Sequence, residues 1–161
     1  MGGHHQTAPV KAPGYGELAF ALPKVGSYER PRISAAENGK VIQSDGSETT
    51  LHALMNGKVT VLSFIFTSCG DVNGCPLASY VLNRLMQRVS EDARLSEKIQ
   101  LLSLSFDRAN DSPAALRKYA AQFGAEKNPS WTFLTTPSDD ELAGILKNYN
   151  QFVIQDVNEQ G

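Results

Sequence analysis

Two near-continuous apolar runs constrain the fold of this chain more than any other feature. They are "VTVLSFIF" (59–66) and "IQLLSLSF" (99–106), rich in leucine, β-branched and aromatic residues. Such runs are typical of strands covered on both faces of a sheet. Between them, apolar residues recur at helical spacing, at Leu77, Val81, Leu82, Leu85, Met86 and Val89. Strand, helix and strand in this order predict an α/β fold with a mainly parallel central sheet flanked by helices.

The second half of the chain continues this alternation. "DSPAALRKYAAQFGA" predicts a helix that begins after an N-cap at Ser112 and stops at Gly124. "WTFLT" (131–135) predicts a short strand. Ser138 and Glu141 have the spacing of a capping box at the start of another helix.

The ends of the chain differ from its middle. Residues 1–16 are rich in Gly, Pro and Ala and are expected to form a flexible lead, while residues 17–161 are expected to form a single domain. The first part of this domain is interrupted by prolines and is predicted to be extended chain with turns. Asp45-Gly46 predicts a β-hairpin after it. "QFVIQDV" (151–157) predicts a strand, and the chain ends shortly after it.

Composition excludes some classes of function. The formal net charge is −2, with 41% hydrophobic and 20% charged residues, so no basic surface is expected for nucleic acid. No apolar segment reaches the roughly 18–20 residues of a membrane span. The start of the chain lacks the pattern of a signal peptide. Membrane association would therefore require a signal or anchor that has been removed.

The two cysteines, Cys69 and Cys75, carry the strongest functional signal. Cys69 follows the strand predicted at 59–66, and Cys75 precedes Pro76, which predicts Cys75 as a helix N-cap. Reactive groups of α/β sheets collect beyond the carboxyl ends of strands, and a helix N-terminus lowers the pKa of a thiol. A working redox pair and a copper site both fit. A structural disulfide and two unrelated buried thiols remain open, whereas a four-cysteine zinc site is excluded by count.

Several separated segments resemble one known family. "FIFTSC…CPL", "LLSLSFDRANDSPAALRKYAAQFGA" and "WTFLT" are similar in sequence and order to the Sco/SenC family of thioredoxin-like proteins, over about Gly46 to Tyr149. The chain looks most like a subgroup in which such a domain occurs beside a c-type cytochrome domain. The resemblance implies a thioredoxin-like (Sco-like) fold whose final hairpin is missing here.

The resemblance also implies a function. In the family, the two cysteines bind copper, as Cu(I) or Cu(II), and cycle between dithiol and disulfide. Family members assist assembly of the binuclear copper centre of cytochrome c oxidase. The implied partners are the copper-site subunit of that oxidase or a c-type cytochrome. The implied location is the periplasm, at the outer face of the bacterial inner membrane.

The family's residues map onto this chain with two departures. Cys69 and Cys75 match its cysteines, but five residues separate them here where the family usually has three. The family's third copper ligand is a later His, and no His follows His52 in this chain, so we expect the domain to be C-terminally incomplete. Asp107 and Asp111 match two acidic residues of the family, in "DRANDSP". We interpret Asp107 as a strand terminator and Asp111 as a helix-entry carboxylate.

Other side chains are weaker candidates for a third ligand. His52 precedes the 59–66 strand and should lie at the end of the strand away from Cys69. His4 and His5 belong to the expected flexible lead. Met55 and Met86 fit core positions better than a copper site.

Three functions therefore compete. The first is a Sco-like metallochaperone in which Cys69 and Cys75 are the copper ligands. The second is a thiol–disulfide electron-transfer protein without bound copper, partnered with the oxidase or with a c-type cytochrome. The third, suggested by "FTSC" at a strand end, is a peroxiredoxin-like peroxidase. As an enzyme, the protein would be at most a thiol–disulfide oxidoreductase.

Overall fold

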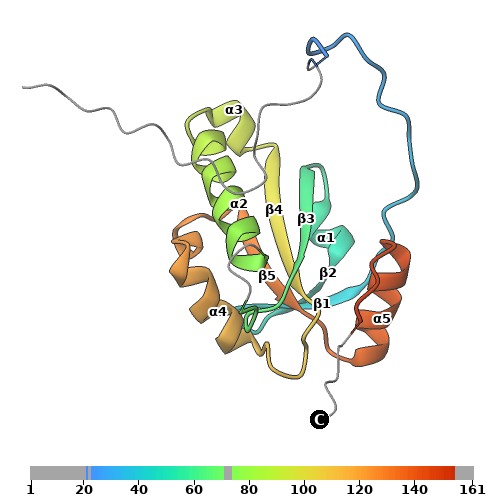
Figure 1. Ribbon diagram of the computed structural model, residues 1–161, viewed down its shortest axis with the longest axis vertical. Coiled ribbons are helices and arrows are strands. Elements are labelled where there is room, and N and C mark those ends of the chain that lie inside the picture. The colour runs from blue at the N-terminus through green and yellow to red at the C-terminus, as the bar shows by residue number, and fades with distance from the viewer. Residues whose placement is uncertain (1–20, 22, 71–73, 155–161) are drawn as a thin grey trace, which may run out of the picture. The chain divides into compact units, whose positions relative to one another are not determined.

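The chain divides into two units, Met1–Ser34 and Ala35–Gly161. The computed structural model describes residues 21, 23–70 and 74–154 (Figure 1). All helices and strands assigned within these ranges belong to the second unit. The expected domain boundary after residue 16 lies outside the described residues and stays a prediction.

The described part of the first unit is extended chain with one turn. The Ser27 backbone N–H and its hydroxyl both donate to the Lys24 carbonyl, at 2.9 and 2.7 Å. Gly26 in that turn has a φ of 83°, a conformation that favours glycine. The expectation of extended chain with turns is therefore confirmed for the residues that can be compared.

The second unit is built on a five-stranded sheet in the order β2-β1-β5-β4-β3. The strands β3, β4 and β5 are parallel, whereas β1 is antiparallel to both β2 and β5. The turn between β1 and β2 contains Gly46 at a φ of 92°, so the predicted N-terminal hairpin is confirmed. The strand bounds are β1 Lys40–Gln43, β2 Glu48–Thr50, β3 Val59–Ile65, β4 Ile99–Ser105 and β5 Trp131–Thr135.

Helices cover both faces of the sheet, which confirms the α/β prediction. The helices are α1 Leu51–Met55, α2 Cys75–Ser90, α3 Ala93–Ser96, α4 Pro113–Gln122, the 3-10 helix η1 Ala125–Lys127 and α5 Asp139–Asn148. Figure 1 shows α2 and α4 on one face and α1 and α5 on the other. Each face has its own apolar core. One contains Ile65, Met86, Val89, Leu101, Leu116, Tyr119, Trp131 and Phe133, and the other Val41, Leu51, Leu102, Leu104, Leu134 and Ile145.

The strand that leads to Cys69 is less covered than its sequence suggested. Val59 and Val61 of β3 are 66% and 36% exposed, so the prediction of a strand buried on both faces is wrong for β3. The reason is its position: among the described strands, β3 pairs only with β4 and lies at the edge of the sheet. The same prediction is confirmed for β4, which is central and buried over nearly its whole length.

The amphipathic pattern after the cysteines forms two helices. The helix α2 ends at Ser90, and Asp92 caps the short α3 by accepting a hydrogen bond from the Arg94 N–H at 2.9 Å. Leu85 is 40% exposed, although it shares the helical spacing of the other apolar residues. Ser79 is fully buried instead.

The predicted caps of α4 and α5 are present. Ser112 accepts from the Ala115 N–H at 3.3 Å, and Gly124 ends that segment at a φ of 65°. Ser138 accepts from the Glu141 N–H at 3.2 Å. The return bond of a capping box is missing, because the Glu141 carboxylate accepts from the Lys40 N–H of β1 at 2.6 Å. This bond ties the hairpin to α5.

The described end of the chain departs from prediction. Residues 151–154 have no regular secondary structure, so the strand expected at 151–157 is absent there, and its remainder lies outside the described residues. None of the helices in the described ranges is long and apolar enough to cross a membrane.

Candidate functional site: a dithiol at the carboxyl edge of the sheet

The two cysteines lie where strand β3 ends and helix α2 begins. Cys69 follows the end of β3, and Cys75 is the first residue of α2. Gly74 is the N-cap, so the prediction of Cys75 as the N-cap is wrong by one position, and Pro76 is the second helical residue. Both cysteines are partly exposed, and they are thiols that no disulfide joins.

The environment of Cys75 favours the neutral thiol. Burial raises the pKa of Cys75, and hydrogen bonding to Cys69 together with the charge of Cys69 raises it further. The Phe66 backbone N–H opposes this effect and lowers the pKa of Cys75. The predicted lowering of this pKa is therefore wrong in direction. The sulfur packs against the apolar core beneath α2, and desolvation there outweighs the effect of the helix N-terminus.

A buried carboxylate supports the backbone between β3 and Cys69. Asp111 is 0% exposed, and its oxygens accept from the Thr67 backbone N–H at 3.0 Å, the Thr67 hydroxyl and the Ser105 hydroxyl at 2.6 Å. Asp111 stands at the entry to α4, directly before the Ser112 cap, as interpreted, but its oxygens bond the ends of β3 and β4. Thr67 and Ser105 were missed in the sequence, where only their position near two strand ends pointed to them.

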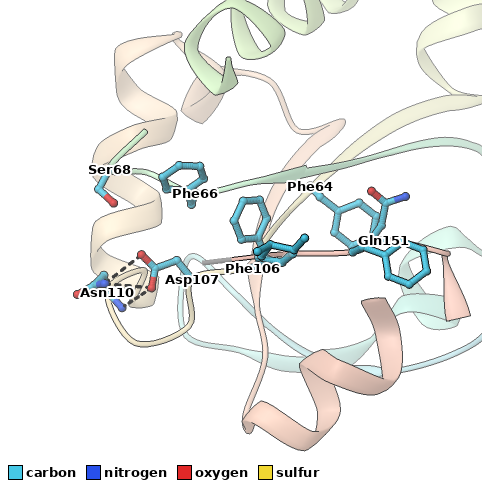
Figure 2. A pocket seen from close by; sticks show the side chains of 10 residues that line it. Phe64, Phe66, Ser68, Phe106, Asp107, Asn110 and Gln151 are labelled. Carbon is cyan, nitrogen blue, oxygen red and sulfur yellow. Dashed lines mark hydrogen bonds between the residues drawn. The ribbon is translucent and has the colours of Figure 1, made fainter. Parts of the chain in front are cut away.

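Asp107 ends β4, as expected. Its backbone N–H donates to the Ser105 hydroxyl at 3.0 Å. Its carboxylate accepts from the Asn110 side-chain amide, with both oxygens at 3.0 Å (Figure 2). These bonds close a turn between β4 and α4, which confirms Asp107 as a strand terminator.

An open cavity of about 580 Å³ lies beside this turn. Figure 2 shows Phe66 and Phe106 between the Asp107–Asn110 pair at one end and Phe64 with Gln151 at the other. The ring centroids of Phe66 and Phe106 are 5.0 Å apart. The remaining lining residues are Ser68, Phe152, Val153 and Ile154. The surface beyond the ends of β3 and β4 is therefore largely aromatic on this side.

A second buried polar pair was also missed in the sequence. The hydroxyls of Ser79, on α2, and Tyr119, on α4, are 2.9 Å apart. Burial raises the pKa of Tyr119, and the charges of Cys75, Cys69 and Asp111 add to this effect, although the Ser79 hydrogen bond lowers it. The pKa of the Tyr119 hydroxyl in the core therefore depends on the charge of the dithiol.

The other candidate ligands lie elsewhere. The His52 ring Nε2 is 2.7 Å from the Ala36 carbonyl oxygen, and its backbone N–H donates to the Asn38 side chain. Met86 is in the core on the α2 face and Met55 packs against the core on the α1 face, as expected. His4 and His5 lie outside the described residues. Across the described ranges, no group of three or more His, Cys, Asp and Glu is placed to hold a metal ion.

The α/β sheet and the dithiol at its carboxyl edge define a protein of the thioredoxin-like class. The family model described as SCO1/SenC matches residues 35–161, which is the whole second unit, and the chain belongs to this family. The family predicted from the sequence segments is therefore confirmed.

Individual relatives agree with this assignment. The SCO1 protein homolog of Bacillus subtilis is 30% identical over 110 residues, which cover 68% of this chain and 53% of that protein. This chain thus spans about half the length of that relative. The structure of yeast Sco1 with copper bound is 28% identical, with a TM-score of 0.61, and the match covers 74% of this chain and 69% of that one.

A third relative is BsSco, described as a member of the Sco family of cytochrome c oxidase assembly proteins in which a disulfide switch is identified. It is 28% identical, with a TM-score of 0.60, and the match covers 74% of this chain and 67% of that one. The thioredoxin-like, Sco-like fold class is confirmed by these structures.

Proposed function

We propose that this protein binds copper through Cys69 and Cys75 and uses the same pair for thiol–disulfide exchange during assembly of the copper centre of cytochrome c oxidase. The observation that carries the proposal is the contact between the two thiols at the carboxyl edge of the sheet. The copper-bound yeast Sco1 and the disulfide switch of BsSco support both parts of it.

Copper is the cargo in this proposal, and the two sulfurs are its ligands. Thiolates are soft ligands that suit Cu(I). Binding Cu(I) between both sulfurs releases the proton of each thiol, so the affinity rises with pH. The raised pKa of Cys75 extends that dependence to higher pH, because the thiol must lose its proton to coordinate. The Phe66 N–H favours the charged sulfur and partly offsets the effect of burial.

The redox step uses the same sulfurs. One thiolate attacks a partner disulfide, forms a mixed disulfide and releases one partner thiolate, which takes up a proton. The second thiolate of the pair then attacks the mixed disulfide and releases the other partner sulfur. The products are a Cys69–Cys75 disulfide and a partner dithiol, so two electrons pass to the partner. The cysteines of an oxidase copper site are the partner that we propose.

The proposed place of action is the outer face of the bacterial inner membrane, in the periplasm. In the role that we propose, the copper-site subunit of the oxidase meets this protein on that side of the membrane.

A second function is favoured by one specific observation. Among the described residues, no third side chain joins the two sulfurs to form a metal-binding group. A dithiol that carries electrons without copper needs no third ligand. In that case the pair reduces a partner disulfide, or passes one electron to each of two ferric c-type haems and releases two protons.

Titration with Cu(I) tests the proposal. We expect the reduced protein to bind one Cu(I) per chain against a competing chelator, and we expect Cys69→Ser and Cys75→Ser each to abolish this binding. His52→Ala is the matched control and should bind like the parent, because its ring contacts the Ala36 carbonyl. A double substitution of His4 and His5 by Ala excludes binding by the N-terminal segment.

The outcomes separate the two functions. The parent protein could fail to bind one Cu(I) through its cysteines while its dithiol still oxidises reversibly in glutathione buffers. That result would contradict the copper-binding proposal and support the electron-transfer function. Unchanged Cu(I) binding in both serine variants would contradict copper ligation by Cys69 and Cys75.

A further inference from the structure

We propose that Asp111 is a positioning residue that holds Cys69 in register with Cys75 before the disulfide forms. The inference rests on the proposed function, because it gives Asp111 a role in the same dithiol. Asp111 acts through the backbone between β3 and Cys69.

The carboxylate of Asp111 is buried and fully hydrogen-bonded to two strand ends. Asp111 is 0% exposed and accepts three hydrogen bonds, two from Thr67 and one from Ser105. A buried charge is costly unless hydrogen bonds satisfy it, and a set of donors aimed at one carboxylate fixes the segments that carry them. Here the donors come from two segments, the end of β3 and the end of β4.

Consecutive backbone groups after the end of β3 point to different partners. The Ile65 carbonyl accepts from the Phe106 N–H at 3.0 Å, which continues the pairing of β3 with β4. The next N–H, of Phe66, bonds the Cys75 sulfur. The following N–H, of Thr67, bonds Asp111. The carboxylate therefore anchors the residue after the one whose amide contacts Cys75.

The chain constrains the positions of both cysteines. Cys69 lies two residues beyond Thr67, whereas Cys75 is fixed at the first position of α2. Anchoring Thr67 limits where the Cys69 sulfur can lie relative to Cys75. Two thiols that are held in contact have a high effective concentration for each other, which favours their disulfide.

The measurable quantity is the equilibrium constant for oxidation by glutathione disulfide. In this reaction the Cys69 and Cys75 thiols give one intramolecular disulfide, and one glutathione disulfide gives two glutathione thiols. We expect Asp111→Ala to lower this constant by about tenfold, equivalent to about 30 mV in the reduction potential. Thr67→Val removes only the hydroxyl donor and should shift the constant less, in the same direction.

Gln100 offers a matched control at the opposite end of the same strand pair. It lies on β4, and its side-chain amide donates to the Leu54 carbonyl at 2.6 Å and to the Thr60 hydroxyl at 2.8 Å. Gln100→Ala therefore also removes buried hydrogen bonds between β4 and the β3 region. Its position is away from the cysteines, so we expect the oxidation constant to stay within about twofold of the parent value.

Each outcome has a clear consequence. Glutathione titrations are read by quantifying thiols, and the urea unfolding midpoint of each variant is measured alongside. A parent-like oxidation constant in Asp111→Ala, or an equal shift in Gln100→Ala, would overturn this inference and leave the proposed function intact. If Asp111→Ala does not fold, a parent-like constant in both Asp111→Asn and Thr67→Val would overturn it. A parent protein that forms no Cys69–Cys75 disulfide would overturn the proposed function as well.

Discussion

The two sulfurs of the dithiol are held differently by the chain. Cys75 is built into the first turn of α2, next to Pro76, whose ring fixes its own backbone φ angle. Cys69 follows the strand end anchored through Thr67. The Cys75 sulfur also packs against the apolar core, and this burial raises the pKa of its thiol. Its chemistry therefore depends on how the core is packed as well as on its place at a helix start.

The raised pKa of Cys75 predicts how the stability of the reduced protein depends on pH. The unfolded chain loses this proton first, near the ordinary value of 9.0, while the folded protein still holds it. The stabilisation is fully present below that value and is lost as the pH rises through the higher folded pKa. We expect the urea midpoint of the reduced protein to fall as the pH rises above 9.0.

Cys75→Ala is the control for this prediction. Burial also raises the pKa values of the buried Tyr119 and the partly exposed Tyr149, which weakens the fold at high pH. Only the difference between the parent and Cys75→Ala therefore reports the thiol. Equal falls in both proteins would contradict the assignment.

The position of the dithiol was predictable from the sequence, but the residues that surround its sulfur atoms were not. The strand run before Cys69 and the proline after Cys75 were local signals. The burial of Cys75 depends on packing against a core whose residues come from several different elements. The partner of Asp111 is 44 residues away along the chain, beyond the reach of any local pattern.

At the scale of the elements, helices α2 and α4 are joined by a buried polar contact. Ser79 is one turn beyond Cys75 on α2, and its hydroxyl meets that of Tyr119 on α4. The Tyr119 ring packs against Phe123 and Phe133 in the same core. The contact therefore fixes one helix relative to the other next to the start of α2.

We expect Tyr119→Phe to lower the free energy of unfolding by about 1–3 kcal/mol, because the Ser79 hydroxyl then stays buried without its partner. The double variant Ser79→Ala/Tyr119→Phe should be more stable than the sum of the two single effects predicts. Urea unfolding of the four proteins measures this coupling. Strictly additive losses would show that the two hydroxyls do not support each other.

Element types were predictable where the signals are local. The caps at Ser112 and Ser138 and the hairpin turn at Gly46 depend on a few neighbouring residues, and all three are present. The exposure of β3 was not predictable, because an apolar run does not reveal whether its strand is central or at an edge. Burial of Ser79 likewise depends on a residue of another helix.

At the scale of the second unit, the hairpin and α5 meet through a close approach of backbone to side chain. A Cβ atom added at Gly39, just before β1, would lie 2.5 Å from both Cγ1 and Cδ1 of Ile145. Ile145 is almost fully buried in the core on that face. The nearby bond from the Lys40 N–H to Glu141 joins residues 101 positions apart. No local sequence pattern predicts such a contact.

Gly39→Ala should therefore destabilise the protein by about 1–3 kcal/mol, as expected for overpacking. Gly144→Ala is the matched control on α5, because a Cβ there meets nothing within 4 Å. Replacing this helical glycine should leave stability unchanged or raise it by up to about 1 kcal/mol. Thermal or urea unfolding distinguishes the two. Equal stability of Gly39→Ala and the parent would mean that Ile145 moves aside without loss.

The polar side chains at the two ends of β3 also determine how this strand is aligned with β4. Its apolar residues Val59 and Val61 are exposed at the sheet edge, so hydrophobic contacts specify the strand alignment less strongly there than at the buried Ile65. Gln100 bonds Thr60 near the start of β3, and Asp111 bonds Thr67 beyond its end. A slip by a single residue would break both attachments together and turn each threonine to the opposite face. The alignment that delivers Cys69 to α2 is thus selected over its shifted alternatives by two polar attachments.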